Sequence, residues 1–205
     1  MSHRRHQLDL RQMSSGQQTA GALASAKSTL LAELRAHALV IGEVTLTSGA
    51  TASYYVDAKR AILRPEGFQA LAKLVAAKAH YWQATAVGGM TMGADPVACA
   101  ALAGGVQAKA FFVRKETKSH GLQRRIEGPP LTPEDRCLVV EDVVTTGGST
   151  LAALAALAEA GHTVCGVVSV LDRLAGGGAA IEAAAGAPYV ALTTIDEVYP
   201  ERAER

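Results

Sequence analysis

Two adjacent carboxylates, Glu141 and Asp142, follow the apolar run 137–140 and precede a stretch of small hydroxyl residues and glycines at 145–149. Two acids at the end of a buried strand repel each other, which lowers stability unless a ligand uses them. A pair of vicinal hydroxyls could donate hydrogen bonds to both acids. The glycines and hydroxyls lie at the start of an Ala/Leu-rich helix, where unpaired N–H groups and the positive end of the helix dipole favour a phosphate. The pattern therefore predicts one strand–loop–helix unit that holds a sugar phosphate.

A simpler interpretation of the same residues is an ordinary strand-to-helix turn with a Ser or Thr helix cap, and the acid pair argues against it. The spacing does not fit Gly-x-x-x-x-Gly-Lys-Ser/Thr, the phosphate loop of nucleotide hydrolases, nor the dinucleotide pattern Gly-x-Gly-x-x-Gly. A serine nucleophile is not indicated either, because Gly-x-Ser-x-Gly does not occur around Ser149.

A second group of residues carries positive charge. Arg114, Lys115, Lys118 and His120 fall within seven residues directly after an apolar run at 108–113. Cations this close repel one another in a packed element, and they suit a loop that closes on a polyanion. Positioned Lys and Arg side chains can stabilise negative charge that develops on a leaving group. The alternative is a solvated surface loop, which is the commoner reason for a run of charges.

A third candidate is the pair Asp172 and Arg173, at the end of the apolar run 163–171. An arginine fork can bind a carboxylate with two parallel hydrogen bonds, so Arg173 could recognise a carboxylated ligand. An Asp–Arg surface pair of little energetic value is the alternative. Upstream, Tyr54 and Tyr55 lie in an alternating segment, so we expect one ring to face the core and the other to face solvent.

The elements around these residues alternate between strands and helices. β-branched apolar runs separated by helical patterns predict an α/β fold with a mainly parallel central sheet flanked by helices. Ligands of such sheets bind beyond the carboxyl ends of the strands, where the candidate residues fall. The expected strands cover 38–46, 53–57, 84–87, 108–113, 137–142, 163–171 and 190–195, and the expected helices cover 29–37, 95–103 and 151–160 together with one that begins at Pro65.

Composition limits the class of protein. The chain has 205 residues, of which 49% are hydrophobic and 19% charged, and its net charge is +1. Near-neutral charge argues against capture of nucleic acid or of an anionic membrane surface. We expect no membrane span, a cytoplasmic location, and reduced thiols at the three widely spaced cysteines. The polar residues 1–26 are expected to form a loose, flexible extension, with Ser28 as the cap of the first helix.

The acid-pair segment resembles the phosphoribosyl pyrophosphate (PRPP) motif of type I phosphoribosyltransferases, matched at every position from Val139 to Ser149. Lys-x-x-Lys-x-His-Gly at 115–121 is similar to the catalytic loop of the orotate phosphoribosyltransferase family in particular. Two further segments agree: the small-residue loop 88–93, and Ser48-Gly49 followed by 53–59. The chain departs from the family pattern at Thr47 and Met92, where a basic residue is common.

The resemblance implies a Mg²⁺-dependent transfer of 5-phosphoribosyl from PRPP to orotate, giving orotidine 5′-monophosphate and pyrophosphate in pyrimidine biosynthesis. It implies a homodimer that shares the catalytic loop between subunits, and Mg²⁺ carried by PRPP with no direct protein ligand. One domain would cover 27–205, with a small hood from about 38–60 and about 174–205. Thr145, Arg173 and Tyr55 would contact orotate. Catalysis would use Lys115, Lys118, His120 and Asp142, and PRPP would be bound by Arg114, Lys115, Lys118, His120, Glu141, Asp142, Val143, Val144, Thr145, Thr146, Gly147, Gly148 and Ser149.

Two alternatives remain open at this point. A purine or pyrimidine salvage phosphoribosyltransferase would share the acid-pair motif but not the Lys-x-x-Lys-x-His-Gly pattern. A PRPP-sensing regulator without catalysis would keep the sugar-phosphate site and lose the cationic loop. Such a regulator would also need a DNA-binding module, for which residues 1–44 are short and weakly basic.

Overall fold

The computed structural model describes residues 2–45, 51–115 and 125–202. Its centre is a six-stranded sheet with the order β5-β4-β3-β6-β7-β8, in which every pairing is parallel except that of β4 with β5. The expected mainly parallel sheet is therefore confirmed. The strands are β3 (Ala86–Met90), β4 (Lys109–Val113), β5 (Ile126–Glu127), β6 (Arg136–Val144), β7 (Thr163–Asp172) and β8 (Tyr189–Thr194).

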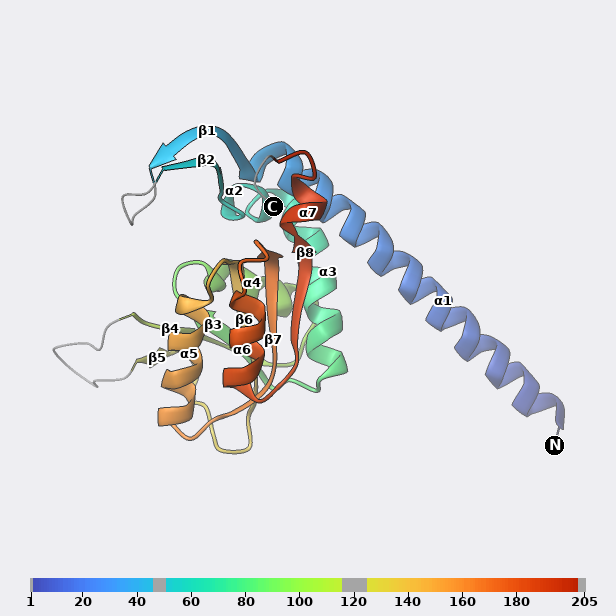
Figure 1. The fold of residues 1–205 in the computed structure, drawn as a ribbon. Helices are drawn as coiled ribbons and strands as arrows, with labels where there is room; N and C mark the ends of the chain where they lie inside the picture. The colour runs from blue at the N-terminus through green and yellow to red at the C-terminus, as the bar shows by residue number, and fades with distance from the viewer. Residues whose placement is uncertain (1, 46–50, 116–124, 203–205) are drawn as a thin grey trace.

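Helices cover both faces of this sheet (Figure 1). Alternate residues of β6 enter different cores, as the period of two in a strand requires. Leu138 and Val140 pack in the core that includes α3 (Pro65–Tyr81) and α4 (Ala94–Ala103). Cys137 and Val139 pack in the core formed with α5 (Gly148–Glu159) and α6 (Gly177–Ala185). A strand buried on both faces is consequently apolar along its length, until the acid pair interrupts it.

A smaller unit stands over the carboxyl edge of the sheet. The antiparallel strands β1 (Leu39–Thr45) and β2 (Thr51–Val56) form their own two-stranded sheet, next to α2 (Lys59–Ile62) and α7 (Ile195–Val198) (Figure 1). The ring of Tyr54 meets that of Tyr199 edge to face, with centroids 5.5 Å apart. This contact joins the N-terminal and C-terminal segments that the sequence assigned to a hood; the boundaries of that unit stay a prediction.

The N-terminal segment differs from its expected conformation. Helix α1 spans Ser2–Glu33 without a break, so the polar stretch 1–26 is helical from its second residue rather than irregular. Ser28 is inside the helix, where its hydroxyl donates to the carbonyl of Ala24 at 3.2 Å, and the expected cap is wrong. Many residues here are good helix formers such as Ala, Gln and Leu, and polarity alone does not oppose a helix.

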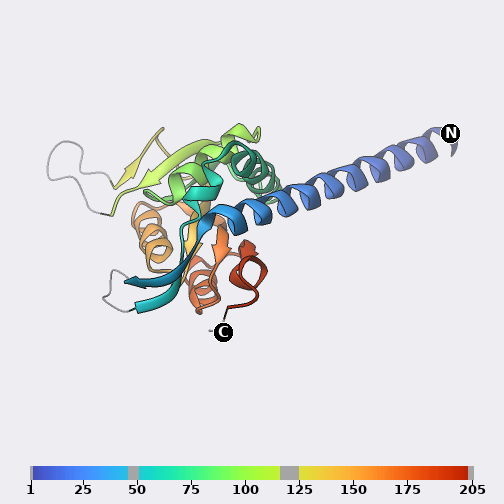
Figure 2. The same cartoon turned by 90° about the horizontal axis from the view of Figure 1, so that it is seen from above.

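Only the second half of α1 packs on the body of the protein. Ala26 and Leu30 are buried, and Lys27 pairs with Glu197 of α7 at 2.8 Å. The first half projects away from the body, as Figures 1 and 2 show. A π-helical turn at Leu34–Ala38 then leads into β1. Across the described residues, no helix is long and apolar enough to cross a bilayer.

Candidate active site

Four neighbouring strands of the central sheet end at the same edge because they run parallel. β4 leads into Arg114, β3 ends at Met90, β6 leads into Thr145, and β7 leads into Arg173. The small β1–β2 sheet overhangs this edge (Figure 1). The topology thus brings together side chains that are far apart in the sequence, as is typical for ligand sites of open α/β sheets.

The acid pair lies inside a strand and not just after one. β6 continues through Val144, so Glu141 and Asp142 are strand residues that are only 5% and 8% exposed. Glu141 accepts hydrogen bonds from the amide of Asp142 at 3.1 Å and from the hydroxyl of Thr150 at 3.2 Å. Asp142 accepts from the amide of Val143 at 2.8 Å and from the ammonium of Lys59 at 3.0 Å. Both carboxylates are therefore held in fixed orientations before any ligand arrives.

Burial and repulsion set the charge of this pair. Burial, followed by the nearby charge of Asp142, raises the pKa of Glu141 well above its usual value of 4.5. Hydrogen bonds to Asp57 and Asp142 outweigh the burial of Lys59 and raise the pKa of its ammonium, so Lys59 is positively charged at neutral pH. In the free protein, Glu141 thus tends to hold a proton while Lys59 balances the charge of Asp142.

The raised pKa of Glu141 has a measurable effect on stability. The folded protein holds a proton that the unfolded chain releases, so the free energy of unfolding falls as pH rises from about 4.5 through the raised pKa. We expect Glu141→Gln to remove this slope and to be more stable than the wild type at pH 8, while losing activity. Urea unfolding between pH 5 and pH 8 measures the effect. Glu159→Gln, whose side chain is 72% exposed, is the control and should leave the slope unchanged.

The small-residue loop turns from β6 into α5. Gly147 has a φ of +83°, a left-handed conformation that favours glycine, and α5 starts at Gly148, three residues before the expected start. Residues 145–150 line a cavity of about 590 Å³ together with Tyr55, Glu141, Val143 and Arg173. The helix N-terminus and the carboxyl group of Glu141 therefore face one space, a combination that suits a sugar phosphate.

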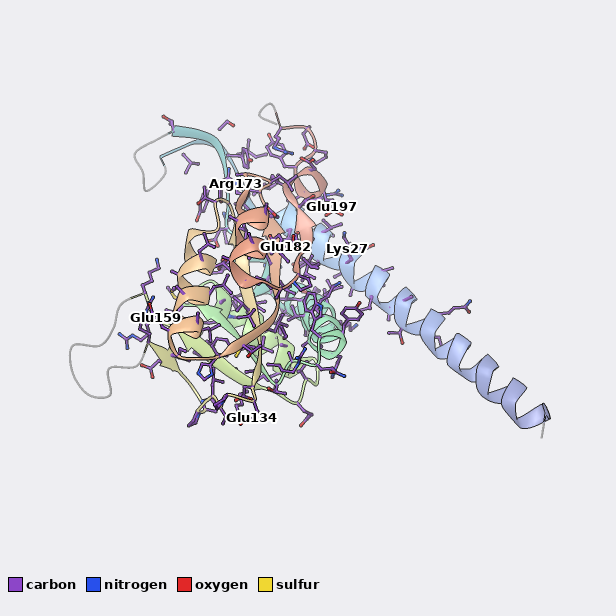
Figure 3. The ribbon with its side chains drawn as sticks, turned by 60° about the horizontal axis from the view of Figure 1, so that its bottom comes forward. Lys27, Glu134, Glu159, Arg173, Glu182 and Glu197 are labelled. Atoms are coloured by element: carbon purple, nitrogen blue, oxygen red, sulfur yellow. The ribbon has the colours of Figure 1, made fainter. Side chains whose placement is uncertain are left out.

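Arg173 lies where β7 leaves the sheet, beneath the β1–β2 strands (Figure 3). Its amide donates to the carbonyl of Val144 at 2.8 Å, and its guanidinium carbon is 5.0 Å from the centre of the Tyr54 ring. Tyr54 is buried and Tyr55 is 40% exposed, so the two rings separate as expected. Arg173 and Thr145 also border a second cavity of about 470 Å³, which includes Tyr54, Asp196 and Arg202. Arg173 is thus shared by two adjoining spaces.

The neighbouring Asp172 has partners of its own. It is 5% exposed and accepts from the amide of Leu174 at 2.7 Å and from the hydroxyl of Tyr189 at 3.0 Å. Both of its oxygens are used in shaping the end of β7. The description of Asp172 and Arg173 as a surface pair therefore fails, and the guanidinium faces the cavities.

The cationic segment begins at the other side of this edge. The amide of Arg114 donates to the carbonyl of Arg125 at 2.8 Å, which extends the antiparallel pairing of β4 and β5. The Arg114 guanidinium lies 3.5 Å from Glu127, and Lys115 is exposed. Lys118 and His120 fall outside the described residues. β5 is the edge strand of the sheet, and β4 and β3 lie between it and β6, which carries the acid pair.

The glycine-rich segment 88–93 lies between these groups. Gly88, Gly89 and Met90 belong to β3, so the loop is shorter than expected. A Cβ atom at Gly93 would overlap the carboxylate of Asp142, which shows that the loop lies directly against the acid pair. The side chain of Met92 is 74% exposed, so no side chain from this position reaches the acids.

Sequence reasoning gave no role to two side chains that contact the acids. Lys59 is 83 residues before Asp142, and no spacing rule links them. Thr150 is closer to the acids in the sequence, since it follows the glycine loop. From the first turn of α5, its hydroxyl donates to Glu141. A hydroxyl one turn into a helix after an acid pair is the signal that could have indicated it.

Comparisons with known proteins agree on one family, although no family model matches the chain. The orotate phosphoribosyltransferase of Corynebacterium glutamicum is 48% identical over 176 residues, which are 85% of this chain and 95% of that protein. The orotate phosphoribosyltransferase of Streptomyces avermitilis is 47% identical over 167 residues, which are 80% of this chain and 91% of that protein.

Solved structures give the same result. Orotate phosphoribosyltransferase of Mycobacterium tuberculosis in complex with Fe(III) dicitrate has a TM-score of 0.76 and 41% identity, covering 85% of this chain and 99% of that one. A second structure of that enzyme, with 5-phospho-α-D-ribosyl 1-diphosphate (PRPP), has a TM-score of 0.72 and 37% identity, covering 84% and 98%. The adenine phosphoribosyltransferase of Trypanosoma brucei, at 14% identity and a TM-score of 0.65, shares the fold, with 86% and 84% covered.

Proposed function

This chain belongs to the orotate phosphoribosyltransferase family, and from that premise we propose which of its residues carry the transfer of phosphoribosyl from PRPP to orotate. One observation supports the assignment most strongly. Glu141, residues 145–150 and Arg173 line a single cavity of about 590 Å³. The two substrates require three kinds of group in one place. PRPP needs an acid for its ribose hydroxyls and a helix N-terminus for its phosphate, and orotate needs an arginine for its carboxylate.

In the proposed complex, PRPP spans the acid pair and the loop that follows it. The ribose hydroxyls donate to Glu141 and Asp142, and the 5′-phosphate is bound by the residues from Thr145 to Ser149. Burial and fixed hydrogen bonds hold these acids in place, so little reorganisation is needed when the sugar binds. Binding energy from the remote phosphate then positions C1′ for reaction.

The chemical step breaks the bond between C1′ and the pyrophosphate oxygen. As it breaks, the ribose ring gains positive charge, which the nearby carboxylate of Asp142 stabilises. Arg114, Lys115, Lys118 and His120 stabilise the negative charge that moves to pyrophosphate. A ring nitrogen of orotate forms the new bond to C1′ from the opposite side as the bond to pyrophosphate breaks, the proton on that nitrogen is released, and no covalent enzyme intermediate is required.

Mg²⁺ would enter with PRPP rather than occupy a protein site. Within the described ranges, no three His, Cys, Asp or Glu side chains gather as ligands. The carboxylates of Glu141 and Asp142 already accept hydrogen bonds from the protein. Such a site suits Mg²⁺, which keeps several waters and prefers substrate phosphates to an all-protein cage. The ion would supply positive charge to the pyrophosphate.

The proposed assembly is a homodimer in which residues 116–124 of one subunit serve the active site of the other. The support is that β4 and β5 hold the ends of this segment at the sheet edge, with two strands between β5 and β6. A cytoplasmic location is also proposed, because both substrates are small anionic metabolites that do not cross membranes unaided.

The role of Arg173 in orotate binding can be tested by substitution. We expect Arg173→Met to raise the KM for orotate about tenfold to a hundredfold, because a charge-assisted bidentate pair is worth about 1.5–3 kcal/mol. The KM for PRPP should change little. Steady-state kinetics with each substrate varied in turn measures both values. Equal losses for the two substrates would show that Arg173 acts by shaping the site and not by binding the carboxylate.

A matched variant separates geometry from charge. Arg173→Lys keeps the charge but loses the fork, so it should recover only part of the orotate affinity. Circular dichroism of both variants checks that the contact with Tyr54 is not needed for folding.

A further inference from the structure

Lys59 connects the overhanging unit to the acid pair. It is the first residue of α2 and comes three residues after β2 ends at Val56. Its amide donates to Asp57 at 3.2 Å, and its ammonium lies 2.9 Å from the same carboxylate. The ammonium also reaches Asp142 in the central sheet, at 3.0 Å. One side chain therefore spans two parts of the fold that the sequence separates by 83 residues.

This ion pair differs from a surface salt bridge, which is worth little. The side chain of Asp142 is 11% exposed and that of Lys59 is 37% exposed. The helix that carries Lys59 is anchored, since Ala61 and Ile62 are fully buried. The anchored helix α2 thus holds the Lys59 ammonium against the nearly buried carboxylate of Asp142. Removal of the ammonium would leave that carboxylate without its counter-ion.

The contact also determines how Asp142 is presented. One oxygen of Asp142 accepts from the amide of Val143, and the other accepts from Lys59. Its neighbour Glu141 is buried and carries a like charge when ionised. Without Lys59, the Asp142 side chain would lose its counter-ion and one of the two hydrogen bonds that orient it.

We propose that Lys59 is a positioning residue for PRPP, because its ammonium is the counter-ion that holds the Asp142 side chain in a fixed orientation, so that the ribose hydroxyls meet a preset acceptor. The inference rests on the proposed role of Asp142 in holding the ribose. Lys59 acts through Asp142 and not on the pyrophosphate or the base. It therefore affects every ligand that carries the ribose hydroxyls, and it affects them equally.

Two ligands separate this role from a direct contact. PRPP and ribose 5-phosphate share the ribose hydroxyls and the 5′-phosphate, and only PRPP carries pyrophosphate. We expect Lys59→Met to weaken both by the same factor, about tenfold to a hundredfold, because Asp142 loses the ammonium that orients it as an acceptor for the ribose hydroxyls. The KM for orotate should stay within about twofold. Isothermal titration of the full chain gives the two dissociation constants, and steady-state kinetics gives the KM.

Control variants keep the result interpretable. Lys59→Arg retains the charge and should recover most of the PRPP affinity. Lys73→Met, at an exposed position of α3, should bind both ligands as the wild type does. If Lys59→Met does not fold, Lys59→Gln keeps a hydrogen-bond donor without the charge and should show the same equal weakening.

Two outcomes would overturn the inference while leaving the proposed function intact. Weaker PRPP binding with unchanged ribose 5-phosphate binding would place Lys59 on the pyrophosphate. Unchanged binding of both ligands would make it a structural ion pair. Failure of the wild type to bind PRPP at all is a different result, because it would refute the proposed function and the inference together.

Discussion

Replacing Asp142 with asparagine should lower kcat/KM for PRPP at least about a hundredfold, because the site loses the carboxylate proposed to stabilise positive charge on the ribose ring. Asparagine has nearly the same shape, and its side-chain oxygen can still accept from the amide of Val143. The second side-chain oxygen becomes an NH2 group, which cannot accept from Lys59, so the change removes the charge and that hydrogen bond while it keeps the shape. Steady-state rates with varied PRPP, together with the melting temperature, measure both effects.

The chain offers a matched control at the other end of the same strand. Asp135 is 6% exposed and pairs with Lys109 at 2.7 Å, so it is also a buried acid held by a lysine. Hydrogen bonds from Lys109, Thr132 and Thr85 outweigh burial and lower the pKa of Asp135 to about 2. Asp135→Asn should therefore lose stability at neutral pH and keep the wild-type KM for PRPP.

The pair of variants separates catalysis from stability. Asp142→Asn should lose activity, and Asp135→Asn should lose stability. If the two variants lost activity and melting temperature in the same proportion, Asp142 would be a structural acid and its proposed role would be wrong.

Replacing Lys118 with alanine should lower kcat about a hundredfold to a thousandfold, since one cation aimed at a developing negative charge contributes on that scale. The melting temperature should change little, because the role proposed for Lys118 is to act on the leaving group and not to stabilise the fold. Lys73→Ala, on the exposed face of α3, is the control and should keep the wild-type kcat. A large fall in melting temperature would contradict a purely catalytic role for Lys118.

Mixing the Lys118→Ala and Asp142→Asn variants tests whether the cationic loop is shared between subunits. When Lys118→Ala and Asp142→Asn exchange subunits, a mixed dimer has one site with both native residues if the loop crosses between subunits. Random pairing then restores about a quarter of the wild-type activity, because half of the dimers are mixed and each has one intact site. No recovery after verified subunit exchange would mean that the loop serves its own subunit.

Much of the fold followed from the sequence, because local patterns and buried runs determine it. Pro65 begins α3 as expected, after the extended residue Arg64. The apolar run before Glu141 is a central strand whose alternate side chains fill two cores. The polarity of the N-terminal segment predicts an irregular extension, whereas the segment is helical and Ala26 and Leu30 anchor the second half of α1.

The site was predictable where its residues are adjacent in the sequence. The acids, the glycine loop and Arg173 fall on strand ends, and parallel topology brings strand ends together. The contact between Lys59 and Asp142 was not predictable, since it depends on how α2 is placed over the sheet. The strand also extends two residues past its expected end at Asp142, because β6 continues pairing with β7 up to Val144.

The most direct test is the reaction itself. Purified protein with Mg²⁺, PRPP and orotate should consume the absorbance of orotate and release pyrophosphate, and the rate should fall to background when EDTA removes the metal. Adenine, hypoxanthine and uracil in place of orotate should give no turnover. Turnover of one of those bases without any loss of orotate would contradict the assignment of the acceptor, while the ribose-phosphate site on β6 and α5 would stand.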